Sequence, residues 1–326
     1  MAYIGNETSN LDVTVRSYYD KLALMTLEFN TVLKQFAESK PLPRNGGKNI
    51  YWNRFSNFSE VTTNLTEGVP PTVIQMSAVA VSATLIQKGF VTEISDLLDM
   101  TSINDDGKAA VARLAYIASI SIDGAIRREI YNTAANSALP ISANVFNQFY
   151  DGSYGNLSAM PSTSCRMTTA VIRNATTKLK QNAVPALEGN DYILVVNPQT
   201  SARLRADSVW QNANQYSGVY AEKIFAGEAG RIEGARVIET PTIPFFASST
   251  AGNVFVSSAE VSAYFSILLG KGALGMTEMN GGLETFTVTG ADKSDPLNQK
   301  SQYGWKVTFI PKTLNASCAV VICTTD

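Results

Sequence analysis

One stretch of the sequence has the spacing of a nucleotide-cofactor site. Gly270, Gly272 and Gly275 match the pattern G-x-G-x-x-G and follow an apolar run at residues 264–269. Such a site requires a helix to begin at once, because the pyrophosphate binds the free amide groups at the helix start. The next residues, 276–282 (MTEMNGG), break a helix instead of starting one. We therefore expect a glycine-rich turn between two strands, and no cofactor.

Histidine is absent from the 326 residues. The chain therefore lacks the base of Ser-His-Asp and Cys-His nucleophiles and the imidazole ligand of common zinc sites. Its three cysteines, Cys165, Cys318 and Cys323, are too few for a four-thiolate metal site and are typical of reduced structural thiols. Hydrolysis by two carboxylates needs no histidine, but no pattern marks such a pair. We predict no catalytic residue, no cofactor and no metal.

Charge and hydropathy indicate what the chain contacts. The net charge of −2 lacks the basic excess of a nucleic-acid-binding protein. Only 17% of the residues are charged, which suggests that much polar surface faces other protein molecules. The first residues do not form a signal peptide, and no apolar run approaches the roughly 18 residues of a membrane span. We expect a cytoplasmic product without a membrane partner.

Apolar residues at helical spacing predict two helical regions in the first half of the chain. Between residues 12 and 38 they predict an amphipathic helix or helix pair, which prolines and glycines at 41–47 end. Its stripe consists of Val15, Tyr18, Tyr19, Leu22, Met25, Phe29, Val32, Leu33 and Phe36. From about 108 to 136 a second stripe predicts a helix of about 40 Å at 1.5 Å per residue. We interpret this second helix as a spine.

The residues between these helices predict a long hairpin. Residues 48–58 are rich in aromatic side chains, residues 79–91 alternate, and the segment 62–72 between them is polar and then rich in glycine and proline. A lone hairpin with so long a tip is marginal in water, so we interpret 48–91 as an arm that rests on another subunit. A hairpin packed on its own core is the alternative. The predicted inter-subunit contacts are Lys48, Tyr51, Trp52, Phe55, Phe58, Glu67, Val69, Pro70 and Pro71.

The second half of the chain mixes helices and strands. We predict an amphipathic helix at 167–179, a buried strand at 192–196 and a short helix capped by Asn197 with proline in its first turn. Further predicted strands are 236–239, 253–256, 284–288, 305–310 and 319–323. The last two must return to a sheet. These elements predict an α+β fold.

The order of these elements resembles the major capsid proteins of tailed bacteriophages with the Hong Kong 97 fold, with coliphage N-four as the most similar branch. Three segments carry the resemblance: residues 230–241 (GRIEGARVIETP), 192–198 (YILVVNP) and the pair Asp295-Pro-Leu-Asn-Gln and Gly304-Trp-Lys. It implies an N-terminal arm at 1–44 and an extended loop at 45–95. It further implies a peripheral domain at 96–204 with a spine helix at 105–136, an axial domain at 205–300 and return strands at 301–326.

The resemblance also implies a function. The chain is expected to assemble with itself into hexamers and pentamers of an icosahedral shell around double-stranded DNA, in the cytoplasm of a bacterial host. Its expected partners are a portal, scaffolding or decoration proteins, and DNA through weak contacts. No Lys-Asn cross-link is predicted. Two alternatives stay open, namely an encapsulin-like nanocompartment shell of the same fold and a histidine-free carboxylate hydrolase.

Overall fold

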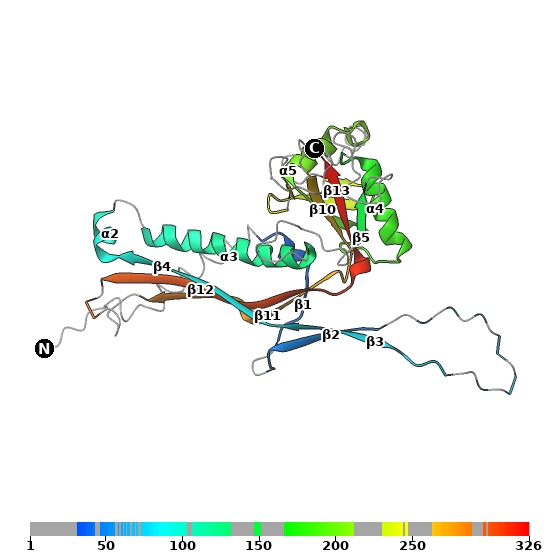
Figure 1. Ribbon diagram of the computed structural model, residues 1–326, viewed down its shortest axis with the longest axis horizontal. Coiled ribbons are helices and arrows are strands. Elements are labelled where there is room, and N and C mark those ends of the chain that lie inside the picture. The colour runs from blue at the N-terminus through cyan, green and yellow to red at the C-terminus, as the bar shows by residue number, and fades with distance from the viewer. Residues whose placement is uncertain are drawn as a thin grey trace.

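The structure is a computed structural model, and it describes residues 31–42, 46–55, 58, 60, 62, 64–65, 67–68, 70, 73–102, 106–131, 147–150, 166–211, 230–243, 245–246, 263–288, 296–297 and 299–325. The molecule is elongated, with a long sheet under one helix, a lobe of mixed helices and strands at one side and a hairpin that extends away from both (Figure 1). The predicted helix at residues 12–30, the strand at 253–256 and Cys165 lie outside the described residues.

The spine helix α3 (Asp106–Tyr131) packs on one face of a four-stranded sheet. In the order of the sheet, its strands are β1 (Glu38–Ser39), β11 (Leu274–Val288), β12 (Lys300–Thr313) and β4 (Ile86–Ser95). Alternate residues of β12, from Tyr303 to Phe309, are buried beneath the helix stripe that begins at Val111. The predicted spine helix is thus confirmed as far as Tyr131, and its expected last residues, 132–136, lie outside the described part.

By length and composition α3 could cross a membrane, although no such segment was predicted from the sequence. More than half of its most apolar stretch is buried inside the protein, as is usual for a core helix. A short helix, α2 (Asp96–Thr101), precedes it and was not predicted.

A second sheet forms the core of the lobe. Its order is β5 (Asn147–Tyr150), β13 (Ala319–Thr325), β10 (Ala263–Leu269), β6 (Tyr192–Val196), β8 (Ala235–Glu239) and β7 (Gly230–Ile232), with β9 (Phe245–Phe246) on β10. Every residue of β6 is buried, as the apolar run predicts. The helices α4 (Thr169–Gln181) and α5 (Pro198–Arg205) belong to this lobe (Figure 1). The predicted cap is confirmed, because the Asn197 side chain accepts a hydrogen bond from the Gln199 amide at 3.1 Å.

Two of the passages of the chain between the two sheets lie at adjacent places. One crossing joins β10 to β11 through the turn that contains Gly270 and Gly272, and the other joins β12 to β13. The Gly270 amide donates to the Cys318 carbonyl at 2.9 Å, and the Leu314 amide donates to the Ala273 carbonyl at 3.0 Å. Gly272 has a positive φ of 75°, which favours glycine. The G-x-G-x-x-G stretch is therefore a turn between strands, as predicted.

The N-terminal residues enter the fold at the middle of α3. The Asp123 carboxylate accepts hydrogen bonds from the amides of Val32 at 2.8 Å and Leu33 at 3.3 Å. Residues Leu33–Phe36 form a 3₁₀ turn, and β1 then pairs in parallel with β11. The prediction that a helix continues to residue 38 is wrong here, because pairing with a distant strand overrides the local helical spacing.

The sheets divide the chain differently from the predicted domain limits. The limit at 204/205 separates β6 from β8 and β10, yet these strands are paired in one sheet. The limit at 300/301 separates β11 from β12, which pair along most of their length. The two closing strands, which were predicted to return to one domain, lie in different sheets. β12 belongs to the sheet under α3, whereas β13 belongs to the sheet of the lobe. The second and third of these differences follow from the two crossings.

We predict that Gly270→Ala destabilises the protein. A Cβ at this position would lie 2.6 Å from Val184 Cγ1 and 3.0 Å from the Cys318 carbonyl oxygen. Relieving such overpacking costs about 1–3 kcal/mol of unfolding free energy. The matched control is Gly124→Ala in α3, where the nearest atoms are arginine tips at 3.9 and 4.0 Å. That change should raise the unfolding free energy by about 0.5–1 kcal/mol. Urea unfolding followed by tryptophan fluorescence measures both, and equal stability of the two variants would contradict the packing argument.

Candidate functional site

The hairpin at residues 49–84 projects from the rest of the chain (Figure 1). It consists of β2 (Asn49–Phe55) and β3 (Ala78–Thr84), which pair only with each other. The predicted second strand of the arm, 79–91, is divided at Leu85, whose amide donates to the Lys48 carbonyl at 2.9 Å. After this residue the chain leaves the hairpin, and β4 pairs with β12 instead. The paired part of the arm is therefore shorter than predicted.

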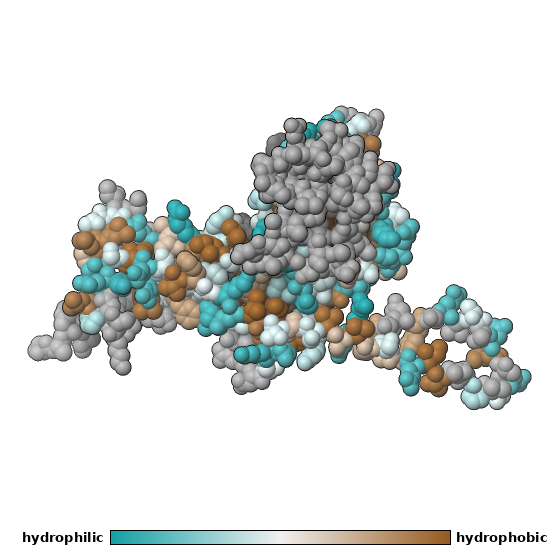
Figure 2. Space-filling view, viewed as in Figure 1, coloured by the Kyte–Doolittle hydropathy of each residue, from teal (hydrophilic) through white to brown (hydrophobic). Residues whose placement is uncertain are grey.

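Most of the predicted contact residues lie on the outside of this hairpin. Tyr51, Phe55 and Phe58 are each more than half exposed, although large aromatic side chains are usually buried. Lys48, Glu67 and Pro70 are also exposed, whereas Val69 and Pro71 lie outside the described residues. Figure 2 shows apolar side chains on the part of the hairpin farthest from the lobe. The arm thus carries apolar surface that the described part of its own chain leaves open.

The structure corrects the role of Trp52. This side chain is only 8% exposed, and its neighbour Ile50 is also buried. Trp52 lines a hollow at the base of the hairpin together with Glu38 and Leu314. The Lys40 ammonium donates to the Tyr51 carbonyl at 2.8 Å at the same place. Because side chains alternate along a strand, the faces of Trp52 and Tyr51 are opposite, and Trp52 anchors the hairpin to its own chain.

The most exposed apolar side chains of the hairpin are not among the predicted contact residues. Val73 is 88% exposed, and Leu65, Ile74 and Met76 are also mostly exposed. They lie between β2 and β3, where the apolar residues have neither helical nor strand spacing. A signal was present in residues 73–76 (VIQM), three of which are apolar, shortly after the two prolines of the tip.

A second apolar surface lies on the face of the long sheet opposite α3. Gly304 is paired with Val91 on one side and with Phe286 on the other, so all three residues share this face. With no side chain at Gly304, the flanking side chains border a shallow groove, which Val288 and Lys306 also line. The Lys306 ammonium lies 5.0 Å from the centre of the Phe286 ring, a cation–π contact. The same ammonium is paired with the Glu284 carboxylate at 3.2 Å, so the groove is apolar with an ion pair at its border.

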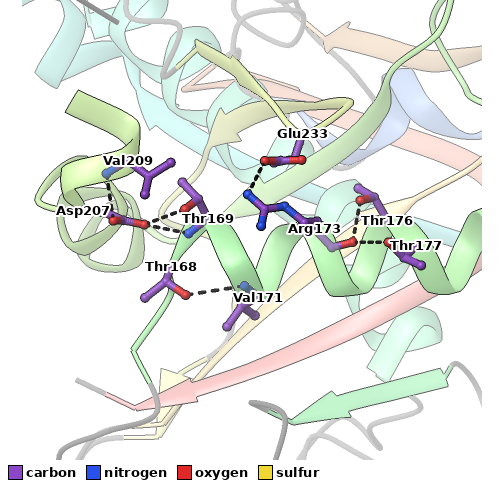
Figure 3. A network of polar contacts seen from close by, with 9 residues as sticks. All are labelled: Thr168, Thr169, Val171, Arg173, Thr176, Thr177, Asp207, Val209 and Glu233. Atoms are coloured by element: carbon purple, nitrogen blue, oxygen red, sulfur yellow. Dashed lines mark hydrogen bonds and ion pairs between the residues drawn. The ribbon is translucent and has the colours of Figure 1, made fainter. Parts of the chain in front are cut away.

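The polar network of the lobe has a structural role (Figure 3). One oxygen of the Asp207 carboxylate accepts from the amide and the hydroxyl of Thr169, both at 2.8 Å, and the other accepts from the Val209 amide at 3.1 Å. Partial burial raises the pKa of Asp207, but these hydrogen bonds outweigh it and the net pKa lies below the usual range. Nearby, Arg173 and Glu233 form an ion pair at 2.7 Å, which holds the pKa of Glu233 low.

The described residues contain no arrangement suited to carboxylate catalysis. A general acid needs a raised pKa beside a second positioned acid. Among the described carboxyl groups, only Asp123 has a clearly raised pKa, mainly because burial disfavours its charge. It is covered by the residues that follow Thr31 and serves as their hydrogen-bond acceptor. Within the described ranges no three metal-ligating side chains come together either.

An open hairpin arm, a long helix on a sheet and a separate mixed lobe define a subunit built to contact other subunits. The family described as "Phage capsid protein" matches residues 148–315, just over half of the chain. The chain belongs to this phage capsid protein family. No curated protein matches the sequence.

Solved structures show the same fold. The capsid of Ralstonia phage GP4 has a TM-score of 0.67 at 13% identity, over 89% of this chain and 87% of that chain. The capsid of cyanophage P-SCSP1u has a TM-score of 0.63 at 16% identity, over 90% and 87%. The virus-like particle from Pyrococcus furiosus has a TM-score of 0.51 at 10% identity, over 94% and 99%.

Family and fold agree with the resemblance found in the sequence. The fold is the Hong Kong 97-like α+β fold of tailed-phage capsids, and the function is that of a structural major capsid protein in the virion shell. The N-four branch stays a prediction.

We predict that Asp207→Asn weakens the lobe at neutral pH by about 1–3 kcal/mol, because three hydrogen bonds to a carboxylate lose their charge. The folded-state pKa of Asp207 is lowered, so its stabilisation is present above the usual pKa of about 3.9 and is lost as the pH falls through the folded value. The difference between wild type and variant should therefore shrink in acid. Glu233→Gln, at an exposed ion pair, is the control and should cost less than about 1 kcal/mol. Urea unfolding from pH 7 to 3 measures these differences, and a constant gap for Asp207→Asn would refute the assignment.

Proposed function

We propose that this protein assembles into hexamers and pentamers of an icosahedral shell that encloses double-stranded DNA. The observation that carries the proposal is the hairpin arm, whose outer side chains are exposed in the isolated chain. Exposed apolar surface of this extent is unfavourable unless another molecule covers it. Because the chain belongs to a capsid family, the covering molecule is another copy of the same subunit.

The arm is suited to reach a neighbour in a defined direction. Its base is held by Trp52 and by the hydrogen bond from Lys40 to the Tyr51 carbonyl. Beyond the base, the exposed group from Phe58 to Met76 is free to contact another subunit. The fixed base sets the direction of the arm, and the open end contacts the neighbouring subunit. Such an end can adjust to small differences in the position of that subunit.

The groove opposite α3 is the counterpart that we propose for this arm. Its apolar residues Val91, Phe286 and Val288 are about half exposed or more. The arm carries apolar side chains of similar size, among them Val73 and Met76. Apolar contact supplies the favourable free energy, at about 25 cal/mol per Å² buried.

The remaining parts of the proposal concern domains and partners. We assign the N-terminal arm to residues 1–44, the extended loop to the β2–β3 hairpin, the peripheral domain to α3 with its sheet and the axial domain to the lobe. The subunit has no enzymatic activity in this proposal, and it assembles in the cytoplasm of a bacterial host. A portal, scaffolding or decoration proteins and packaged DNA are its further partners. Particles filled with protein instead of DNA would favour the nanocompartment alternative.

Deletion of residues 60–76 should leave a folded subunit that fails to form shells. A finer variant, Val73→Ser with Ile74→Ser and Met76→Ser, should have the same effect, since it removes apolar surface without shortening the arm. The control is Val209→Ser, an exposed apolar side chain of the lobe, which should assemble normally. Negative-stain electron microscopy reads out particles, and circular dichroism reads out folding. Normal shells from either arm variant would contradict the proposed role of the arm.

The free subunit should bind duplex DNA weakly. Its net charge of −2 provides little counterion release, which dominates non-specific affinity for DNA. We expect a dissociation constant weaker than about 1 μM near physiological salt, as for ordinary non-specific binding. Fluorescence anisotropy with a labelled duplex measures it, and tight, salt-sensitive binding would contradict the prediction.

A further inference from the structure

The hollow at the base of the hairpin is lined by positive charge. Lys40 comes from the segment after β1, Arg54 from β2 and Lys271 from the turn between β10 and β11. Among the described residues that line it, Glu38 is the one acid, so three cations and one carboxylate leave an excess of two positive charges. The hollow has a volume of about 490 Å³, which is within the usual range for a ligand site. Its size and its charge suit an anionic group.

The backbone at each of the three cations is held in place. The Lys40 amide donates to the Met276 carbonyl at 2.9 Å, and the Lys271 amide donates to the Pro185 carbonyl at 3.1 Å. Arg54 belongs to β2, whose residues are paired with β3. Three separate parts of the chain therefore bring positive side chains together on a fixed backbone. Such preorganisation lowers the entropic cost of binding an anion.

These positive charges are not neutralised by the described part of the chain. The Lys40 ammonium donates to the Tyr51 carbonyl at 2.8 Å, which is a neutral acceptor. Neither Arg54 nor Lys271 forms an ion pair with a carboxylate of the described residues. Cations that share one hollow repel each other, and a bound anion relieves this repulsion.

The arm carries carboxylates that complement this hollow. Glu60 and Glu67 lie between β2 and β3, and both are exposed. Within the described ranges neither is paired with a cation, unlike the lobe acids Glu233 and Glu239. Figure 2 shows hydrophilic surface at the far end of the hairpin. The two negative charges of the arm equal the positive excess of the hollow.

One arm is long enough to reach both the groove and the hollow of the same neighbour. Leu314 in the hollow follows Lys306 at the border of the groove by eight residues, about 26 Å along an extended strand. In the arm, thirteen residues separate Glu60 from Val73, and an extended chain of this length spans up to about 43 Å. The apolar residues of the arm can therefore occupy the groove while its carboxylates occupy the hollow.

We infer that the hollow of one subunit binds the arm carboxylates Glu60 and Glu67 of a second copy of this chain. The inference rests on the proposed function and adds a receiving site for the polar part of the arm. Each subunit then offers its arm at one place and receives an arm at another, which is a heterologous contact of the kind that closes into rings. The opposite charges determine which part of the arm lies at the base of the next arm.

Charge reversal on either side tests the pairing. A hollow variant, Arg54→Glu with Lys271→Glu, and an arm variant, Glu60→Lys with Glu67→Lys, should each give at least about ten-fold fewer shells than the wild type, because like charges then meet at every contact. All four changes in one chain should restore shells, since the charges are again opposite. Negative-stain electron microscopy counts the particles, and circular dichroism checks that each variant is folded.

The matched control reverses the same amount of charge elsewhere. Lys178→Glu with Lys180→Glu changes two lysines of α4, which line neither the hollow nor the groove, and should assemble as the wild type does. An equal loss of shells in this control would assign the effect to net charge and overturn the inference. Normal shells from the hollow and arm variants, or no recovery with all four changes, would also overturn it and leave the proposed function standing. A wild type that forms no shells would instead contradict the proposed function.

Co-expression of the hollow variant with the arm variant tests whether the carboxylates come from another copy. In the mixture each arm meets a hollow of opposite charge when the two variants alternate around a ring. Shells should therefore form from the mixture although neither variant forms them alone. Recovery should be partial, because a ring of five cannot alternate without one mismatched contact. A mixture with no more shells than the separate variants would show that the hollow takes a free anion instead, and would refute the pairing between copies.

Discussion

The architecture depends on two adjacent crossings between its sheets. The chain passes from the lobe to the sheet under α3 near Gly270 and returns near Cys318, and the two passages are hydrogen-bonded to each other. Buried backbone groups must be paired, so each crossing satisfies donors or acceptors of the other. A residue larger than glycine at position 270 would meet Val184 and the Cys318 carbonyl. Close packing at this point fixes how the lobe and the spine sheet are joined, and every outward surface is placed relative to that joint.

The apolar residues of the chain serve two different purposes. Those of α3, β6 and β10 form the core, where they stabilise the single subunit. Those of the hairpin and the groove remain exposed in the chain. An apolar surface of the second kind stabilises nothing until it is covered. The division between the two sets is therefore a division between folding and assembly, and it agrees with the low fraction of charged residues.

Local signals in the sequence predicted local structure well. The buried strand 192–196, the Asn197 cap and most of the spine helix were predicted because short-range periodicity and capping determine them. The sheet partners of β6 and β11 could not be predicted, since strand pairing joins residues far apart in sequence. Trp52 shows the same limit for the site: alternation places it opposite Tyr51, but only the position of Leu314 and its neighbours decides which of the two faces is buried. The family resemblance, not the local pattern, provided the function.

The glycines at 270, 272 and 275 show why a motif must be judged by its surroundings. Their spacing is that of a phosphate-binding loop, yet each has a separate structural cause. Gly270 has no space for a side chain, Gly272 has a left-handed backbone conformation, and a Cβ at Gly275 would lie 2.9 Å from Leu314. A phosphate site would need free amides at a helix start, but here the Gly270 amide is bonded to Cys318 and a strand follows. These glycines thus belong to a turn that joins two sheets. The function of this protein lies in its exposed surfaces.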